Sequence, residues 1–335
     1  MPAIRRSFAF ENFFKKLGRA AAVGLVVAAS SHASAQLVEG KPLSPQVFES
    51  WISQKAKPVK KWSDVDRGKP VVLFGEDHNA VVHFDFLAEN AAGLKKSGIT
   101  HVFFEYEASF QKILDDYLQT YSENKKTPSK EKEKMLEKLK FQLLEMREYG
   151  SRGKKAKIKL FEALHDAGIK IKLVDDQKYI APIPTEQGVW FRDYGRNVLF
   201  SEEIDKLLDG KNRILMVVGN WHALNSFGMP WLLQHGDKKS LVQSILIAGG
   251  FDHPTWHYEL SLQNALKSQK PHLVPLEKLE TKTTVLHPNF NDILYLPSMQ
   301  KSPYATAKSA ADFTSELFLD PRKLDFKKLY SPPPK

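Results

Sequence analysis

The 335-residue chain contains no cysteine, and this absence removes several classes of chemistry at once. Disulfide bonds, thiolate metal sites and a cysteine nucleophile are excluded, as is anchoring through a lipidated N-terminal cysteine. Stability must therefore come from packing, hydrogen bonds and ion pairs. Because 42% of the residues are hydrophobic, the chain can bury a large core without covalent cross-links.

Sequence signatures of several known activities are missing as well. There is no Gly-x-Ser-x-Gly nucleophile elbow, no phosphate-binding P-loop and no His-Glu-x-x-His zinc motif. Helix-turn-helix, RNA-recognition and zinc-finger patterns are also absent, and the Lys and Arg residues are interspersed with Glu and Asp. We therefore expect no nucleic-acid partner, despite the formal net charge of +10.

Residues 1–35 have the layout of a secretory signal peptide. Five basic residues precede a short apolar stretch at 20–29, and Ala33-Ser34-Ala35 then supplies a small-x-small cleavage signal. The stretch is too short to span a bilayer, and no later segment is apolar enough to form a transmembrane span. We expect an exported protein, periplasmic or secreted, that is cleaved after Ala35. Arg5-Arg6 leaves the twin-arginine route open beside the general secretory one, and a retained N-terminal helix is the alternative.

Loss of the leader's five basic residues and one acidic residue would lower the net charge from +10 to +6.

The rest of the chain alternates strand-like apolar runs with helix-like periodic ones. Apolar residues spaced three and four apart predict the helices. Strands that alternate with helices favour an α/β fold with a mainly parallel central sheet flanked by helices, over residues 70–300. The runs with the length and composition of buried strands are 71–74, 101–106, 169–174, 214–218, 244–248 and 293–296.

Three segments fall outside that alternation. Residues 36–69 are expected to form a lead-in with one short helix, and residues 301–335 a C-terminal tail. Between about 123 and 157 the chain is heavily charged, and 130–148 has the spacing of a long helix that ends in a glycine-containing stretch. We expect a helical insertion there, which either packs over the sheet as part of a lid or is a solvated surface helix.

Polar residues cluster where the predicted strands end. In a parallel sheet the carboxyl ends of the strands share one edge, which is where open α/β folds place their ligands. A short glycine-containing motif marks two of these ends, Gly75-Glu76-Asp77-His78 and Gly219-Asn220-Trp221-His222. We therefore expect one site at this edge. The residues that follow or close the strands are Glu76, His78, Glu105, Glu107, Asp175, Asp176, Asn220 and His222.

So many carboxylates cannot all stay ionised side by side unless a cation, a shared proton or shifted pKa values compensate. A divalent metal held by Glu76, His78, Glu105 and His222 would resolve the conflict, and so would general acid–base catalysis by the same four residues. Each of them also has an ordinary alternative role, as a helix cap or a packing residue.

Two further residues are candidates for the same site. Arg192 lies at the start of a predicted helix and could neutralise the acidic edge. His83 lies five residues past His78, in the first turn of the next predicted helix, where it could face either the ligand or the core.

Four motifs of this chain resemble those of a superfamily that joins the ChaN-like haem-binding proteins, the erythromycin esterases and the Tiki and TraB proteins. His83 and Gly228-Met229-Pro230 favour the ChaN-like branch, in which a further histidine and a Gly-x-Pro follow the corresponding motifs. The resemblance covers about residues 70–300. The motifs that carry it are Gly75-Glu76-Asp77-His78, Phe104-Glu105, Arg192-Asp193 and Gly219-Asn220-Trp221-His222-Ala223.

The resemblance implies two different functions. The ChaN-like branch implies binding of haem and a part in iron uptake, with His78, His83, His222 and Arg192 as the residues that would contact the cofactor. The esterase and Tiki branches imply hydrolysis by the matching His and Glu residues, with a divalent metal ion in the Tiki case. ChaN-like proteins are often lipoproteins, and the lack of cysteine departs from that pattern. The sequence thus predicts a small-molecule or haem ligand and leaves binding and hydrolysis as alternatives.

Overall fold

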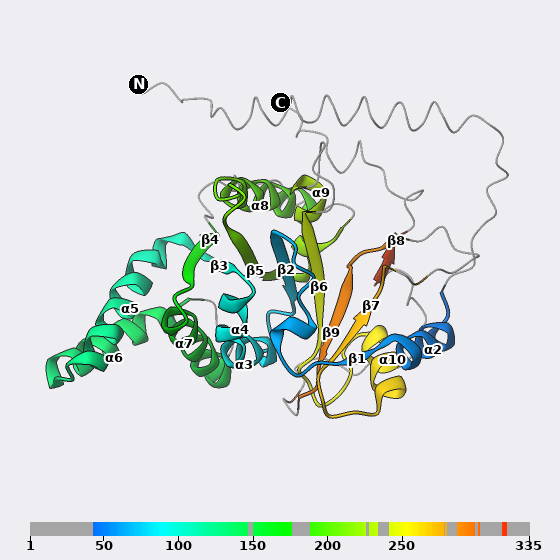
Figure 1. Cartoon of the computed structure of the whole chain (residues 1–335), viewed down its shortest axis with the longest axis horizontal. Coiled ribbons are helices and arrows are strands. Elements are labelled where there is room, and N and C mark those ends of the chain that lie inside the picture. Colours follow the sequence, from blue (N-terminus) through cyan, green and yellow to red (C-terminus); the bar gives the residue numbers. More distant parts are fainter. Residues whose placement is uncertain are drawn as a thin grey trace, which may run out of the picture.

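The computed structural model describes residues 43–146, 150–175, 188–225, 228–233, 241–277, 279, 287–298, 301 and 317–319. Parallel pairing joins β2 (Val71–Glu76), β3 (Ile99–Glu107), β4 (Lys170–Asp175), β5 (Arg213–Gly219), β6 (Val242–Gly249) and β9 (Asp292–Leu296). Antiparallel pairing adds β7 (His272–Pro275) and β1 (Lys57–Pro58). The eight strands form one sheet in the order β1-β7-β9-β6-β2-β5-β3-β4 (Figure 1). The predicted mainly parallel α/β fold is confirmed.

The strands are apolar on both faces because helices cover both. All six residues of β2 are buried. Val72 and Phe74 pack in the core on one face of the sheet, and Val71 and Leu73 pack in the core on the other. This division follows from the two-residue period of a β-strand.

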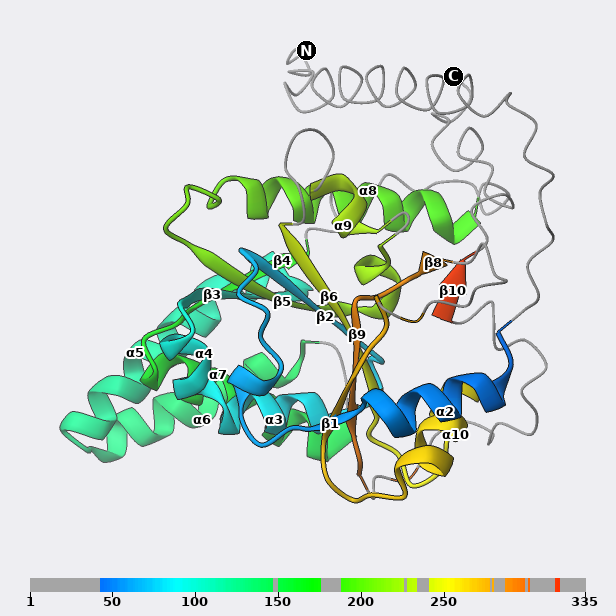
Figure 2. The same ribbon diagram turned by 45° about the vertical axis from the view of Figure 1, so that its right-hand side comes forward.

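Helices on both faces give the molecule three layers. On the Phe74 face lie α3 (Val82–Glu89), α4 (Ala91–Lys96), α5 (Gln111–Lys126), α6 (Lys130–Leu144) and α7 (Gly150–Asp166). On the Leu73 face lie α2 (Pro45–Lys55), α8 (Gly188–Asp205), α9 (Met229–Leu233) and α10 (His257–Leu266). Figures 1 and 2 show α8 and α9 above the sheet and α3 and α4 below it. A separate pair is formed by β8 (His287–Pro288) and β10 (Phe318–Leu319).

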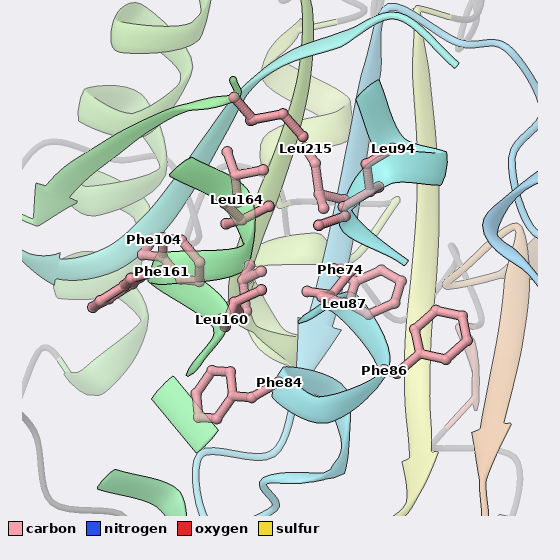
Figure 3. Packing of buried hydrophobic residues seen from close by; sticks show 14 of the residues in the cluster. Phe74, Phe84, Phe86, Leu87, Leu94, Phe104, Leu160, Phe161, Leu164 and Leu215 are labelled. Carbon is pink, nitrogen blue, oxygen red and sulfur yellow. The ribbon is translucent and has the colours of Figure 1, made fainter. Parts of the chain in front are cut away.

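Phenylalanine rings and leucine side chains pack together in the core on the α3 side (Figure 3). Phe74 of β2 stacks on Phe86 of α3 with 6.5 Å between ring centroids, and Phe104 of β3 meets Phe161 of α7 edge-on at 5.3 Å. Such pairs contribute about 0.5–1.5 kcal/mol each beyond the area they bury. Because β2 and α3 are both anchored in this core, the short loop that joins them starts and ends at fixed points. That loop carries His78.

The structure describes only some of the segments that were predicted to lie outside the strand–helix alternation. Helix α6 lies within the predicted insertion, but Glu123 and Lys157, its predicted limits, fall inside α5 and α7. Helices α5 and α6 extend past the β4 edge of the sheet (Figure 1). Residues 1–35, with the predicted signal peptide, lie outside the described residues. No helix in the described ranges is long and apolar enough to cross a membrane.

Candidate functional site

Residues that are distant in the sequence meet where β2, β5, β3 and β4 end. Glu76 pairs with Gly219 across β2 and β5, and Glu107 pairs with Asp175 across β3 and β4. The β3–β4 register shifts between Phe104 and Glu107, which is the signature of a β-bulge or similar irregularity. Bulges redirect side chains at strand ends. The irregularity includes Glu105, whose carboxylate turns toward α8.

Glu76 and His78 form a carboxylate–imidazole pair. Nδ1 of His78 lies 2.6 Å from Oε1 of Glu76, so the ring donates its Nδ1 proton to the carboxylate. Asp77 closes the turn between them and α3, because its Oδ1 accepts the Asn79 N–H and its carbonyl accepts the Ala80 N–H, both at 2.9 Å. The Glu76 side chain is 3% exposed and that of His78 is 40% exposed. The pair therefore combines a buried carboxylate with an accessible ring.

Two glycines permit the close approach of the two halves of the site. A Cβ on Gly219 would lie 3.0 Å from Nε2 of His78. A Cβ on Gly75 would lie 3.1 Å from the Cβ of Ala223, in the short 3-10 helix Asn220–Ala223 that carries His222. Such contacts are tighter than nine in ten real Cβ contacts, so a side chain at either position would force its neighbours to shift by a few tenths of an ångström. Each glycine thus leaves room for the motif that contains the other one.

A buried arginine, Arg196 of α8, supplies the positive charge at this edge. Its Nε and Nη2 donate to the two carboxylate oxygens of Asp175 at 3.2 and 2.6 Å, and Nη2 also donates to Oε1 of Glu105. Oε2 of Glu105 accepts the Gly219 N–H at 2.7 Å. Burial alone would lower the pKa of Arg196, but the carboxylates of Glu105 and Asp175 outweigh it and raise the pKa. The guanidinium therefore stays charged and compensates the carboxylates.

His222 is buried beside this arginine and is held in one orientation. Its Nδ1 lies 2.6 Å from Oδ1 of Asn197, so Nδ1 carries the proton and Nε2 is the unprotonated nitrogen. Nε2 lies 3.4 Å from Nη1 of Arg196 and 3.6 Å from Oε1 of Glu105. Burial lowers the pKa of His222 to about 4, and the nearby Glu105 carboxylate offsets only part of that effect. His222 is consequently neutral at physiological pH.

His83 lies behind Glu76 and not at the exposed edge. Its side chain is 0% exposed, and its Nε2 is 3.8 Å from Oε2 of Glu76. Its ring packs against that of Phe84, with 4.1 Å between centroids. Of the two orientations left open by the sequence, the core-facing one is observed.

The structure brings Glu76, His78, Glu105 and His222 together, but two partners were missed. Arg196 and Asn197 lie one turn beyond Arg192, the arginine proposed from the sequence. The side chain of Arg192 and all of Asp176 lie outside the described residues. A signal for Arg196 was present, because it stands four and eight residues before Phe200 and Ile204, which are both buried. Helical periodicity therefore places Arg196 on the face of α8 that packs against the sheet.

This set of donors fits a divalent metal poorly. Within the described ranges, no group of three or more His, Asp or Glu side chains is arranged to hold a metal ion. The guanidinium of Arg196 already contacts both Glu105 and His222, so a metal bound to those two side chains would meet a permanent positive charge.

One residue of the set, His78, is suited to bind haem, because a single imidazole can hold the haem iron. His78 is exposed, and its second ring nitrogen is fixed by a carboxylate, as is usual for metal-binding histidines. His83 and His222 are both buried, which leaves a bulky cofactor no access to either ring.

Comparisons with known proteins give only distant likenesses. No protein-family model and no curated protein matches the chain. A protein from Bacillus cereus of solved structure is 12% identical with a TM-score of 0.46, and the match covers 79% of this chain and all of the other. An erythromycin esterase mutant in its open conformation is 8% identical with a TM-score of 0.42, over 73% of this chain and 94% of the esterase. ChaN of Campylobacter jejuni, described with cofacial haem, is 16% identical with a TM-score of 0.32, over 55% and 83% of the two chains.

The last two proteins come from families that the sequence motifs resemble. All three TM-scores are below 0.5, so these likenesses assign neither a branch of the superfamily nor an activity. The function has to be inferred from the residues of this chain.

Arg196→Met should lower the free energy of unfolding by about 3–5 kcal/mol, because it leaves two carboxylates buried without their cation. Urea unfolding at pH 7 measures this deficit. The matched control is Lys206→Met, which removes an exposed partner of Glu203. A deficit no larger than that of the control contradicts this account.

Acidification from pH 6.5 to 4 should destabilise the protein partly through His222. Within this window the unfolded chain takes up a proton on this ring, whose ordinary pKa is 6.5, whereas the buried ring does not. The loss from this group should total about 3 kcal/mol. In His222→Gln the free energy of unfolding should therefore depend less steeply on pH between 4 and 6.5.

Proposed function

We propose that this protein is a hydrolase that activates water with the Glu76–His78 pair. The observation that carries the proposal is the 2.6 Å hydrogen bond from Nδ1 of a partly exposed histidine to a buried carboxylate. Glu76 fixes the tautomer, so that Nε2 of His78 is the unprotonated nitrogen. Triad hydrolases orient their catalytic imidazole in the same way. The resemblance of the motifs to those of erythromycin esterases supports the same reaction class.

The proton transfers follow from this tautomer. Nε2 of His78 takes a proton from water as the water oxygen bonds to the carbonyl carbon of an ester or amide. When the bond to the leaving group breaks, His78 returns that proton to the departing oxygen or nitrogen. One water molecule is consumed, and an acid and an alcohol or amine are formed. Glu76 accepts the hydrogen bond from Nδ1 throughout and stabilises the imidazolium form.

Glu105 would stabilise the same imidazolium from the other side. Its Oε1 lies 3.8 Å from Nε2 of His78, close enough for a favourable charge interaction once the ring is protonated. Arg196 and the Gly219 N–H hold the Glu105 carboxylate in place before the reaction begins. Charges that are positioned in advance lower the barrier without reorganisation during the reaction.

Haem binding through His78 is the second candidate function. The observation that favours it is the same exposed ring, whose Nε2 can bind iron while Glu76 holds Nδ1. The resemblance to ChaN-like proteins supports this alternative. Binding of a divalent metal by Glu105 and His222 receives no such support, because Arg196 contacts both side chains.

Hydrolysis of a small activated ester such as p-nitrophenyl acetate should fall by about 100-fold or more in His78→Gln, because the general base is removed. Glu76→Gln should also lower kcat, by about 10-fold or more, because an amide no longer stabilises the imidazolium. His165→Gln is the matched control for a histidine-to-glutamine change outside the site. If His78→Gln and Glu76→Gln hydrolyse the ester as fast as His165→Gln does, this pair is not the base.

Titration of the purified protein with haem separates the second candidate from the first. Binding through His78 should shift the Soret band, and His78→Ala should abolish the shift. His222→Ala should retain it, because the buried ring of His222 is inaccessible to haem. A protein that gives no Soret shift does not bind haem through this residue.

A further inference from the structure

His83 is a buried imidazole that makes no hydrogen bond with the described core residues around it. Its side chain is 0% exposed, and neither ring nitrogen has a hydrogen-bond partner among the described residues. Most buried polar groups in proteins are paired, because leaving one unpaired is costly. Burial lowers the pKa of His83, so the ring is neutral, with one N–H donor and one acceptor nitrogen. An apolar side chain of similar size would suit this position better.

The polar group in front of His83 is the carboxylate of the proposed catalytic pair. Nε2 of His83 lies 3.8 Å from Oε2 of Glu76, while Oε1 of Glu76 accepts the Nδ1 proton of His78 at 2.6 Å. The carboxylate therefore has an imidazole on each side, one exposed and one buried. The gap to His83 exceeds a hydrogen bond by about 0.6–1 Å, which a small shift of the carboxylate would close.

We propose that His83 is a positioning residue for Glu76, donating a hydrogen bond from Nε2 to Oε2 when the carboxylate shifts toward it. This inference rests on the proposed hydrolase function and adds a residue to it. A second donor stabilises the ionised carboxylate and makes it a weaker base. The proton that His78 takes from water then stays on His78 and is available for the leaving group. The buried ring nitrogens of His83 thus lower the stability of the fold, and in return the ring positions Glu76 for the reaction.

A purely structural role for His83 predicts a different effect of replacing the ring with an apolar side chain. If the ring only fills space, an apolar replacement should change neither the reactivity of His78 nor catalysis. If the ring positions Glu76, the same replacement should stabilise the fold and impair the site. Stability and reactivity measured on the same variants therefore separate the two roles.

The test compares His83→Leu, which removes both ring nitrogens, with His83→Gln, which keeps a donor of similar reach. His83→Leu should raise the Tm by about 2–4 °C, because an unpaired buried polar group is removed. It should lower kcat for ester hydrolysis by about 10-fold with little change in KM, because the carboxylate behind the base is less well held. His83→Gln should restore most of kcat. Phe86→Leu controls for altered packing of α3 and should lower Tm without this effect on kcat.

A second readout does not require activity. Diethyl pyrocarbonate modifies the unprotonated nitrogen of an accessible histidine, and mass spectrometry of peptides follows its rate at His78 alone. The rate should fall by about threefold or more in His83→Leu and recover in His83→Gln, because Glu76 sets the tautomer and basicity of His78. A His83→Leu variant that loses stability and leaves this rate unchanged overturns the role of His83. If the rate falls as expected while even the unaltered protein hydrolyses no ester, the hydrolase function fails and the positioning of Glu76 by His83 stands.

Discussion

The ion-pair cluster in which Arg196 binds Asp175 and Glu105 is the interaction on which this edge of the sheet depends. Glu76, Glu105 and Asp175 are buried carboxylates at or near the ends of their strands, and the last two contact a guanidinium that stays charged at any physiological pH. The cluster joins α8 to β3 and β4, and Glu105 extends it to β5 through the Gly219 N–H. The rings of His78 and His222 both face Glu105, and they are therefore positioned relative to this fixed charge.

The site has a buried part, which fixes the geometry, and an exposed part, which a ligand can reach. His222, Asn197 and Arg196 are buried and form a framework that large ligands do not reach. His78 is the accessible group, and it is oriented by Glu76 from behind. A single oriented imidazole can accept a proton or bind iron, which is why hydrolysis and haem binding lead back to the same nitrogen. The charge of Arg196 weighs against a metal shared by Glu105 and His222, because two cations would then compete for the same donors.

The sequence predicted the six parallel strands because each is a short apolar run buried on both faces. It missed β7, a four-residue strand bounded by His272 and Pro275 that pairs antiparallel with β9. The sequence grouped Glu76, His78, Glu105 and His222 because parallel strands end at one edge of the sheet, and the structure brings these four side chains together there. Arg196 and Asn197 were missed although the helical period places Arg196 on the packed face of α8, because which strand ends that face covers depends on long-range packing. The predicted limits of the helical insertion, Glu123 and Lys157, lie inside α5 and α7, which both pack in the core.

Gly75 and Gly219 link the assembly of the site to the order in which the chain folds. Each glycine makes room for the other's histidine motif, so neither motif has its working geometry until β5 lies beside β2. These two strands are far apart in the sequence, and contacts of that kind form slowly because a long loop must close first. A nascent or partly folded chain therefore does not yet hold the two histidine motifs side by side, and this edge of the sheet takes its final geometry only once β2 and β5 have paired.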